Sequence, residues 1–115
     1  MDEDFVRDLF EGQGPVRIRR MFGGHGVWLD DRIVAVIFRD EIFLKSDEVT
    51  AAFFEDAGAR RWSYGRAGKP PVMMPYHALP SEAYDDPDAM TLWARRANEA
   101  AGRAGRKQPR SRQKR

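Results

Sequence analysis

The sequence has no cysteine among its 115 residues. This absence excludes disulfides, thiolate nucleophiles and cysteine-ligated metal sites, and it fits a reducing compartment. No apolar run approaches the ~20 residues that a membrane-spanning helix needs, and the acidic start of the chain lacks the basic and apolar regions of a signal peptide. We therefore expect a cytoplasmic protein that does not enter the membrane.

Residues that usually carry chemistry are also scarce. His25 and His77 are the only histidines, and their spacing matches no metal-binding motif. The serine and threonine hydroxyls lie in no recognisable nucleophile motif. We expect no catalytic residue, no metal site and no cofactor, and we predict that the chain is not an enzyme.

Charge is distributed unevenly along the chain. Residues 1–101 hold all 18 acidic residues and 13 of the 20 Lys and Arg residues, a net charge of −5. Residues 102–115 hold the other seven cations and no large apolar side chain. This predicts one domain over residues 1–101 and a basic disordered tail over residues 102–115.

Two roles for the tail stay open. It has no aromatic side chain on which bases could stack, so any attraction to nucleic acid would be weak and independent of sequence. The other role is solubilisation. The cations that could contact phosphates are Arg103, Arg106, Lys107, Arg110, Arg112, Lys114 and Arg115.

The first half of the chain has one helical pattern and then several strand patterns. Apolar residues at helical spacing over 5–10 predict a helix that ends at the Gly/Pro segment 12–15. Residues 26–29, 32–38 and 41–45 are typical of strands in antiparallel hairpins. Residues 16–18 are either a further strand or an extension of the next one.

The second half has two predicted helices around a hairpin. Ser46 or Asp47 can cap a helix that ends near Gly58, and the predicted strands cover residues 61–64 and 71–74. The expected buried side chains of this helix are Val49, Ala52, Phe53 and Ala57.

Asp86 followed by Pro87 indicates the start of the last helix, and Gly102 its end. Its expected buried stripe is Met90, Trp93, Ala94, Ala97 and Ala101. The whole pattern predicts an α+β fold in the order α-β-β-β-α-β-β-α, with an antiparallel sheet of about five strands and helices packed mainly on one face.

The most unusual local segment is glycine-rich. It consists of Arg20, Met21, Phe22, Gly23, Gly24, His25 and Gly26. Phosphate-binding glycine loops open into a helix, whereas this segment leads into the strand pattern of residues 27–29. We predict a structural corner between strands, with a small-ligand or anion site as the alternative.

Lys45 ends a strongly apolar strand pattern. It is either a strand-end lysine whose ammonium stays in water, or it faces Arg20 across the sheet and forms a small basic site for an acidic partner.

The glycine-rich segment, then Ile42-Phe43-Leu44-Lys45, Trp62-Ser63-Tyr64, Pro75-Tyr76 and the helix with Pro87 and Trp93 together resemble the N-terminal domain of the TfoX/Sxy family. The resemblance covers roughly residues 5–101. It implies an α+β domain similar to the type III secretion chaperones. The named members of that family regulate natural competence together with a cyclic-AMP receptor protein, and they carry a second, C-terminal helical domain that residues 102–115 do not resemble.

The resemblance therefore implies a non-enzymatic regulatory or adaptor domain. We expect it to bind a protein partner, for example a transcription regulator, and a homodimer is an alternative arrangement. We expect the interaction surface on the exposed side of the sheet, because aromatic side chains left on a solvent face tend to mark interfaces. The candidate contact residues are Trp28, Phe43, Lys45, Trp62 and Tyr76.

Overall fold

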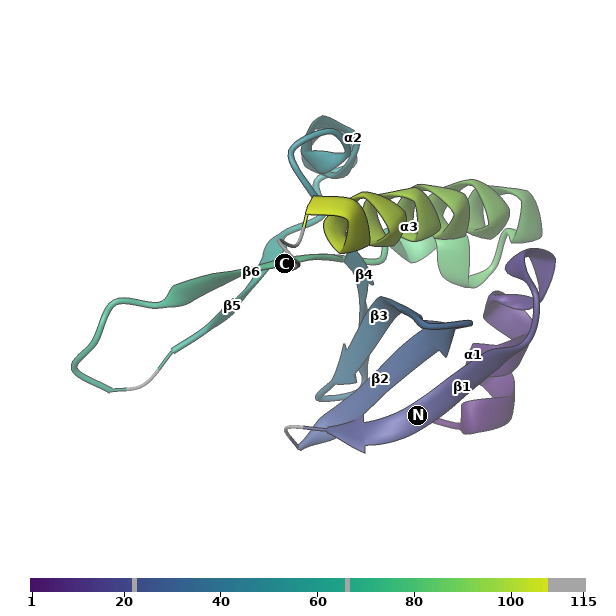
Figure 1. Cartoon of the computed structure of the whole chain (residues 1–115), viewed down its shortest axis with the longest axis horizontal. Coiled ribbons are helices and arrows are strands. Elements are labelled where there is room, and N and C mark those ends of the chain that lie inside the picture. Colours follow the sequence, from purple (N-terminus) through teal and green to yellow (C-terminus); the bar gives the residue numbers. More distant parts are fainter. Residues whose placement is uncertain (22, 66, 108–115) are drawn as a thin grey trace, which may run out of the picture.

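A six-stranded antiparallel sheet forms the centre of the molecule, in the order β1-β2-β3-β4-β6-β5 (Figure 1). The computed structural model describes residues 1–21, 23–65 and 67–107. The α+β class is confirmed, with one strand more than expected because residues 16–18 belong to a full edge strand. The strands are β1 Val16–Met21, β2 Gly24–Leu29, β3 Arg32–Phe38, β4 Glu41–Lys45, β5 Arg61–Tyr64 and β6 Val72–Ala78.

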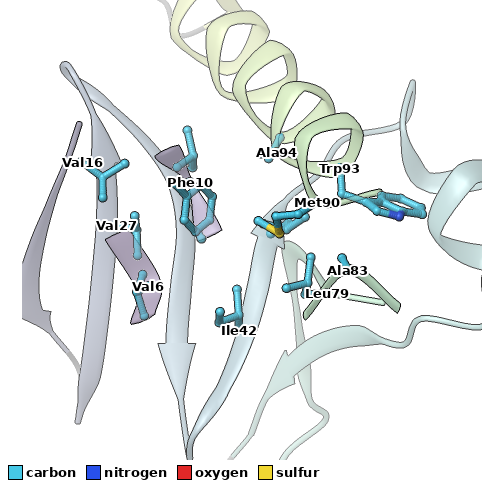
Figure 2. Packing of buried hydrophobic residues seen from close by; sticks show 14 of the residues in the cluster. Val6, Phe10, Val16, Val27, Ile42, Leu79, Ala83, Met90, Trp93 and Ala94 are labelled. Atoms are coloured by element: carbon cyan, nitrogen blue, oxygen red, sulfur yellow. The ribbon is translucent and has the colours of Figure 1, made fainter. Parts of the chain in front are cut away.

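Three helices contribute to one core on one face of this sheet. They are α1 Glu3–Leu9, α2 Ala51–Asp56 and α3 Pro87–Lys107, with short 3₁₀ turns at Glu11–Gln13 and Ser81–Tyr84. Figure 2 shows side chains from α1, α3 and the strands meeting in this core. Burying a large apolar side chain contributes about 1.5–3 kcal/mol, so this layer supplies most of the apolar stabilisation. In the described part of the chain, no helix is long and apolar enough to cross a membrane.

Helix α3 begins as the sequence predicts. Asp86 accepts hydrogen bonds from the backbone N–H groups of Asp88 and Ala89 at 3.0 and 3.3 Å, so it satisfies donors that the first turn leaves free. Pro87 occupies the first helical position, where no N–H is needed. The whole predicted stripe is buried: Met90, Trp93, Ala94, Ala97 and Ala101.

The predicted end of α3 is wrong. The helix continues through Gly102 to Lys107, so the expected boundary between residues 101 and 102 falls inside a helix. Gly102 is buried, and a Cβ there would lie 3.1 Å from the guanidinium of Arg32. Glycine thus costs about 1 kcal/mol of helix propensity at this position, but it makes room for an arginine from β3.

The predicted buried stripe of α2 is also wrong. Val49 and Phe53 are exposed, whereas Phe54 is fully buried. The ring of Phe54 lies 4.8 Å from the rings of both His77 and Trp93, so it joins β6 to α3. The helix has only two turns, and its orientation is therefore set by this aromatic contact and not by its own periodicity.

The glycine-rich corner is the hairpin between β1 and β2. Gly23 has a φ of 77°, a conformation that other residues avoid. A Cβ on Gly24 would lie 2.1 Å from the carbonyl oxygen of Ile37, and one on Gly26 would lie 2.4 Å from the ring of Trp28. These three glycines therefore lie where a side chain would be strained or would clash, which fits a structural corner; Phe22 lies outside the described residues.

We predict that Gly24→Ala destabilises the protein by about 3 kcal/mol, because the added methyl group meets rigid backbone of the neighbouring strand. Gly105→Ala is the matched control, since nothing lies within 4 Å of its Cβ position in α3. We expect that control to be neutral or stabilising by up to about 1 kcal/mol. Urea unfolding measures both, and equal stability of the two variants would contradict the close approach at Gly24.

Candidate functional site

The second face of the sheet has no described helix packed on it. A separate apolar cluster lies there, built on Val36, Phe43, Tyr76 and Ala78. We call this surface, together with the residues that share its side of the sheet, the open face. The strand register also places Arg17, Arg19, Met21, Trp28 and Lys45 on it, because paired residues of antiparallel strands point to the same side.

Trp62 is the centre of the open face. Its ring lies 5.6 Å from the rings of Phe38 and Phe43 and 5.9 Å from that of Tyr76. Such contacts add about 0.5–1.5 kcal/mol per pair beyond apolar burial. Trp62 therefore covers one side of the sheet without any helix above it.

The five predicted contact residues do lie on one face, but at different depths. Trp28, Lys45 and Trp62 are half-buried and reach solvent. Phe43 and Tyr76 are only 3% and 7% exposed. The expectation that Phe43 is an exposed aromatic residue is wrong, because Trp62 packs over it and makes it part of the floor.

Cationic side chains lie over three rings of this cluster. The guanidinium groups of Arg39 and Arg60 lie 5.2 and 5.5 Å from the ring centroids of Phe38 and Phe43. The ammonium group of Lys45 lies 5.0 Å from the Tyr76 ring. Partial burial lowers the pKa of Lys45, against the opposing effect of Asp47.

Two small hollows flank Trp62. One has a volume of about 180 Å³ and extends from Met21 and His25 to Tyr76. The other has a volume of about 190 Å³ and reaches Tyr64. Phe38, Trp62 and Met74 line both, so the two hollows adjoin one another and offer mainly apolar walls.

The hairpin of β5 and β6 extends away from the rest of the molecule (Figure 1). We call residues 61–74 of this hairpin the arm. Tyr64, Val72 and Met73 on the arm are each at least half exposed. By register, Tyr64 and Val72 lie on the side of the open face and Met73 lies on the opposite side, so Tyr64 and Val72 continue the apolar surface of the open face beyond the body of the domain.

The sequence model of the TfoX N-terminal domain family matches residues 8–101. The chain belongs to this family. A comparison with curated protein sequences found no match. The match includes every strand, α2, most of α3 and only the last two residues of α1, so the open face and arm are parts of the TfoX N-terminal domain itself.

A buried hydrogen bond between Ser46 and His77 was not predicted from the sequence. Ser46 Oγ and His77 Nδ1 lie 2.7 Å apart, and both residues are at most 5% exposed. Burial lowers the pKa of His77, and the charge of Arg61 adds to this effect. The pair resembles a nucleophile and base, but neither residue lines any of the described pockets, so it fixes β6 against the end of β4.

We predict that His77 makes the stability of this TfoX N-terminal domain depend on pH. Its pKa is below 6.5 in the folded state, so the unfolded chain takes up the proton first as the pH falls. Stability should be complete above about pH 6.5 and should decline below it, by at most about 1.4 kcal/mol per pH unit for one group.

Urea unfolding at pH 5, 6 and 7 measures this slope. In His77→Gln the His77 contribution should disappear, whereas His25→Gln, at the other histidine, should retain it. An unchanged slope in His77→Gln would show that other groups cause the dependence.

A second unpredicted contact joins Asp47 to Arg103. Arg103 donates to the Asp47 carboxylate through Nε at 2.6 Å and Nη2 at 3.1 Å. The same carboxylate accepts from the backbone N–H groups of Val49 and Thr50, each at 3.1 Å. The hydrogen bonds from Arg103, followed by those from Thr50, lower the pKa of Asp47.

The predicted role of Arg103 in a free tail is therefore wrong. Arg103 and Arg106 lie in α3, and Lys107 is its last described residue. Arg110, Arg112, Lys114 and Arg115 lie outside the described residues, so their contact with nucleic acid stays a prediction.

We predict that Arg103→Met destabilises the protein by about 1–3 kcal/mol, because it leaves the partly buried Asp47 carboxylate without its cation. Arg95→Met, on the exposed side of the same helix, is the control and should change stability by less than about 0.5 kcal/mol. Thermal or urea unfolding measures both. Equal effects would show that the pair contributes nothing specific.

The other predicted basic site does not form. Lys45 lies on the open face, whereas the register places Arg20 at the far edge strand and on the opposite face. Lys45 instead lines a cleft of about 480 Å³ with Arg32 and Arg106, beside the last turns of α3. Within the described ranges, no group of three or more His, Asp or Glu residues has the arrangement of a metal site.

Proposed function

We propose that this TfoX N-terminal domain is a non-enzymatic, cytoplasmic regulatory or adaptor domain that binds a protein partner through the open face and the arm. The observation that carries the proposal is that the described helices contribute to the core on one face, while on the other face no described helix covers the half-buried rings of Phe38 and Trp62 above a buried floor. A surface of this kind on a small domain is typical of a binding site.

The shape of the surface supports the same proposal. The two hollows beside Trp62 are each smaller than 200 Å³, whereas small-molecule pockets usually have about 300–1,000 Å³. Each hollow is of a size for one side chain of a partner. Met21 and Met74, which line these hollows, are flexible, polarisable residues that adapt to different apolar surfaces.

The family supports a regulatory role in broad terms. A link to competence or to a transcription regulator is the finer part of the proposal. The glycine-rich corner between β1 and β2 contributes by shape, because glycine at position 26 leaves room for Trp28 on the open face. A small ligand or anion at the corner stays the alternative.

Site-specific photo-crosslinking in an extract of the source cells tests this function. A benzophenone amino acid at Tyr64 on the arm should give discrete protein adducts, and the same group at Arg95 on the exposed side of α3 should not. Unlabelled chain should suppress the adducts, whereas unlabelled Trp62→Ala should not, because removing a central aromatic anchor typically costs 2 kcal/mol or more of binding.

The same adducts from both positions would contradict a role for the open face. Light scattering after size exclusion shows whether a second copy is the partner, and a dimer that persists in Trp62→Ala would lie elsewhere on the molecule.

A further inference from the structure

We propose that the open face binds an acidic segment of a partner protein that also carries apolar side chains. This inference rests on the proposed function and adds the chemistry of the partner. The open face combines two properties: an apolar floor with hollows, and a rim on which cations outnumber carboxylates.

The rim has five cations and one carboxylate. Arg17, Arg19 and Lys45 share the open face by register, and Arg39 and Arg60 lie over its rings. The carboxylate is Glu41, which already forms an ion pair with Arg60. The open face is therefore positive although residues 1–101 carry a net charge of −5.

The negative charge lies elsewhere on the molecule. Asp and Glu residues gather in α1, α2 and the segment that leads into α3. The charge of the domain is thus distributed asymmetrically. The acidic residues lie mainly on the helices and the segments beside them, whereas the open face of the sheet is basic. Such an asymmetry accelerates encounter with an acidic partner and disfavours a basic one.

Arg19 and Arg39 are the rim cations most available to a partner, since Arg60 is paired with Glu41 and Lys45 is half-buried. The cation–π contacts hold the guanidinium groups of Arg39 and Arg60 beside the apolar hollows without neutralising them. Arg19 and Arg39 are exposed, and neither has an ion pair among the described contacts. A peptide carboxylate can therefore pair with a cation while the neighbouring apolar side chain enters a hollow.

The same charges argue against a symmetric dimer through this face. A twofold contact would bring five cations of one copy against the same five of the other, and like charges across an interface cost free energy. Nucleic acid is the competing occupant, because Trp62 and Tyr64 reach solvent and can stack with bases, and the test below separates it from a peptide. An acidic peptide with apolar residues matches both the rim and the hollows.

Selection from a displayed library of random 12-residue peptides against the full chain tests the inference. We expect enriched peptides to have a net negative charge and at least two aromatic or large aliphatic residues. A selected peptide, labelled for fluorescence anisotropy, should bind at least tenfold more weakly to Trp62→Ala and more weakly to wild type as salt is raised.

Charge reversal at adjacent residues of β1 gives the matched comparison. Arg19→Glu reverses a charge on the open face, and Arg20→Glu reverses one on the opposite face of the same strand. We expect about a fivefold or greater loss of peptide affinity for Arg19→Glu and less than a twofold change for Arg20→Glu. Circular dichroism and urea unfolding check that both variants fold.

The outcomes separate this inference from the proposed function. Enriched peptides that are neutral or basic but still depend on Trp62 would overturn only the acidic chemistry. Equal effects of the two charge reversals would do the same, and displacement of the peptide by a 12-residue oligothymidine would assign the face to nucleic acid. If no peptide is enriched, or if binding ignores Trp62, both the inference and the role of the open face fail.

Discussion

The structure depends on an unequal covering of the two faces of one sheet. All the described helices contribute to the core on one side, and the other side is closed by Trp62 together with Phe38 and Met74. A sheet face left to itself would expose Val36, Phe43 and Tyr76 to water. Trp62 buries much of this surface through three ring contacts, but it remains half-exposed itself. The open face consequently has a buried floor that stabilises it, and it still exposes apolar surface at Trp62.

The helix side is held by contacts between segments that are distant in the sequence. Phe54 packs between His77 and Trp93, and Asp47 pairs with Arg103, so α2 and the turn before it are tied to both β6 and α3. These contacts give the two-turn helix α2 a defined place that its own propensity could not provide. The arm, by contrast, extends away from the body, which suits a segment that contacts a partner.

The elements that were predicted correctly have local signals in the sequence, such as capping residues or runs of strand-forming residues. Asp86 and Pro87 predicted the start of α3, and the runs of β-branched and aromatic residues predicted β2 to β4. Gly102 led to a wrong prediction of the end of α3. Glycine is typical of helix ends, but here it lies within the helix and leaves room for the side chain of Arg32. A contact between residues 32 and 102 has no local signature.

For the candidate residues, the sequence predicted a shared face of the sheet but not how deeply each side chain is buried. The pleat of β4 places Phe43 and Lys45 on one side of that strand, and this part could be read from the sequence. The burial of Phe43 depends on β5 crossing over to the far side of β6, which puts Trp62 above it. The pairing of Ser46 with His77 depends on the same neighbouring position of β6 beside β4. Strand order depends on contacts between residues that are distant in the sequence. Neither the burial of Phe43 nor the Ser46–His77 hydrogen bond could therefore be predicted from local sequence patterns.

The basic rim also affects how two copies of this domain would approach each other. Edge strands with free backbone groups and apolar surface invite association with other strands, and proteins commonly prevent this with inward charges, short edges and bulges. Here the edge strand β1 carries Arg17, Arg19 and Arg20, while the other edge, β5, has only four residues and an irregular register with β6. Two copies that approached each other at β1 would bring like charges together. Two copies that approached at β5 would find only a short strand with an irregular register for pairing. The cations that keep copies apart are the ones that would attract a carboxylate, so one set of arginines can serve both solubility and the choice of an acidic partner.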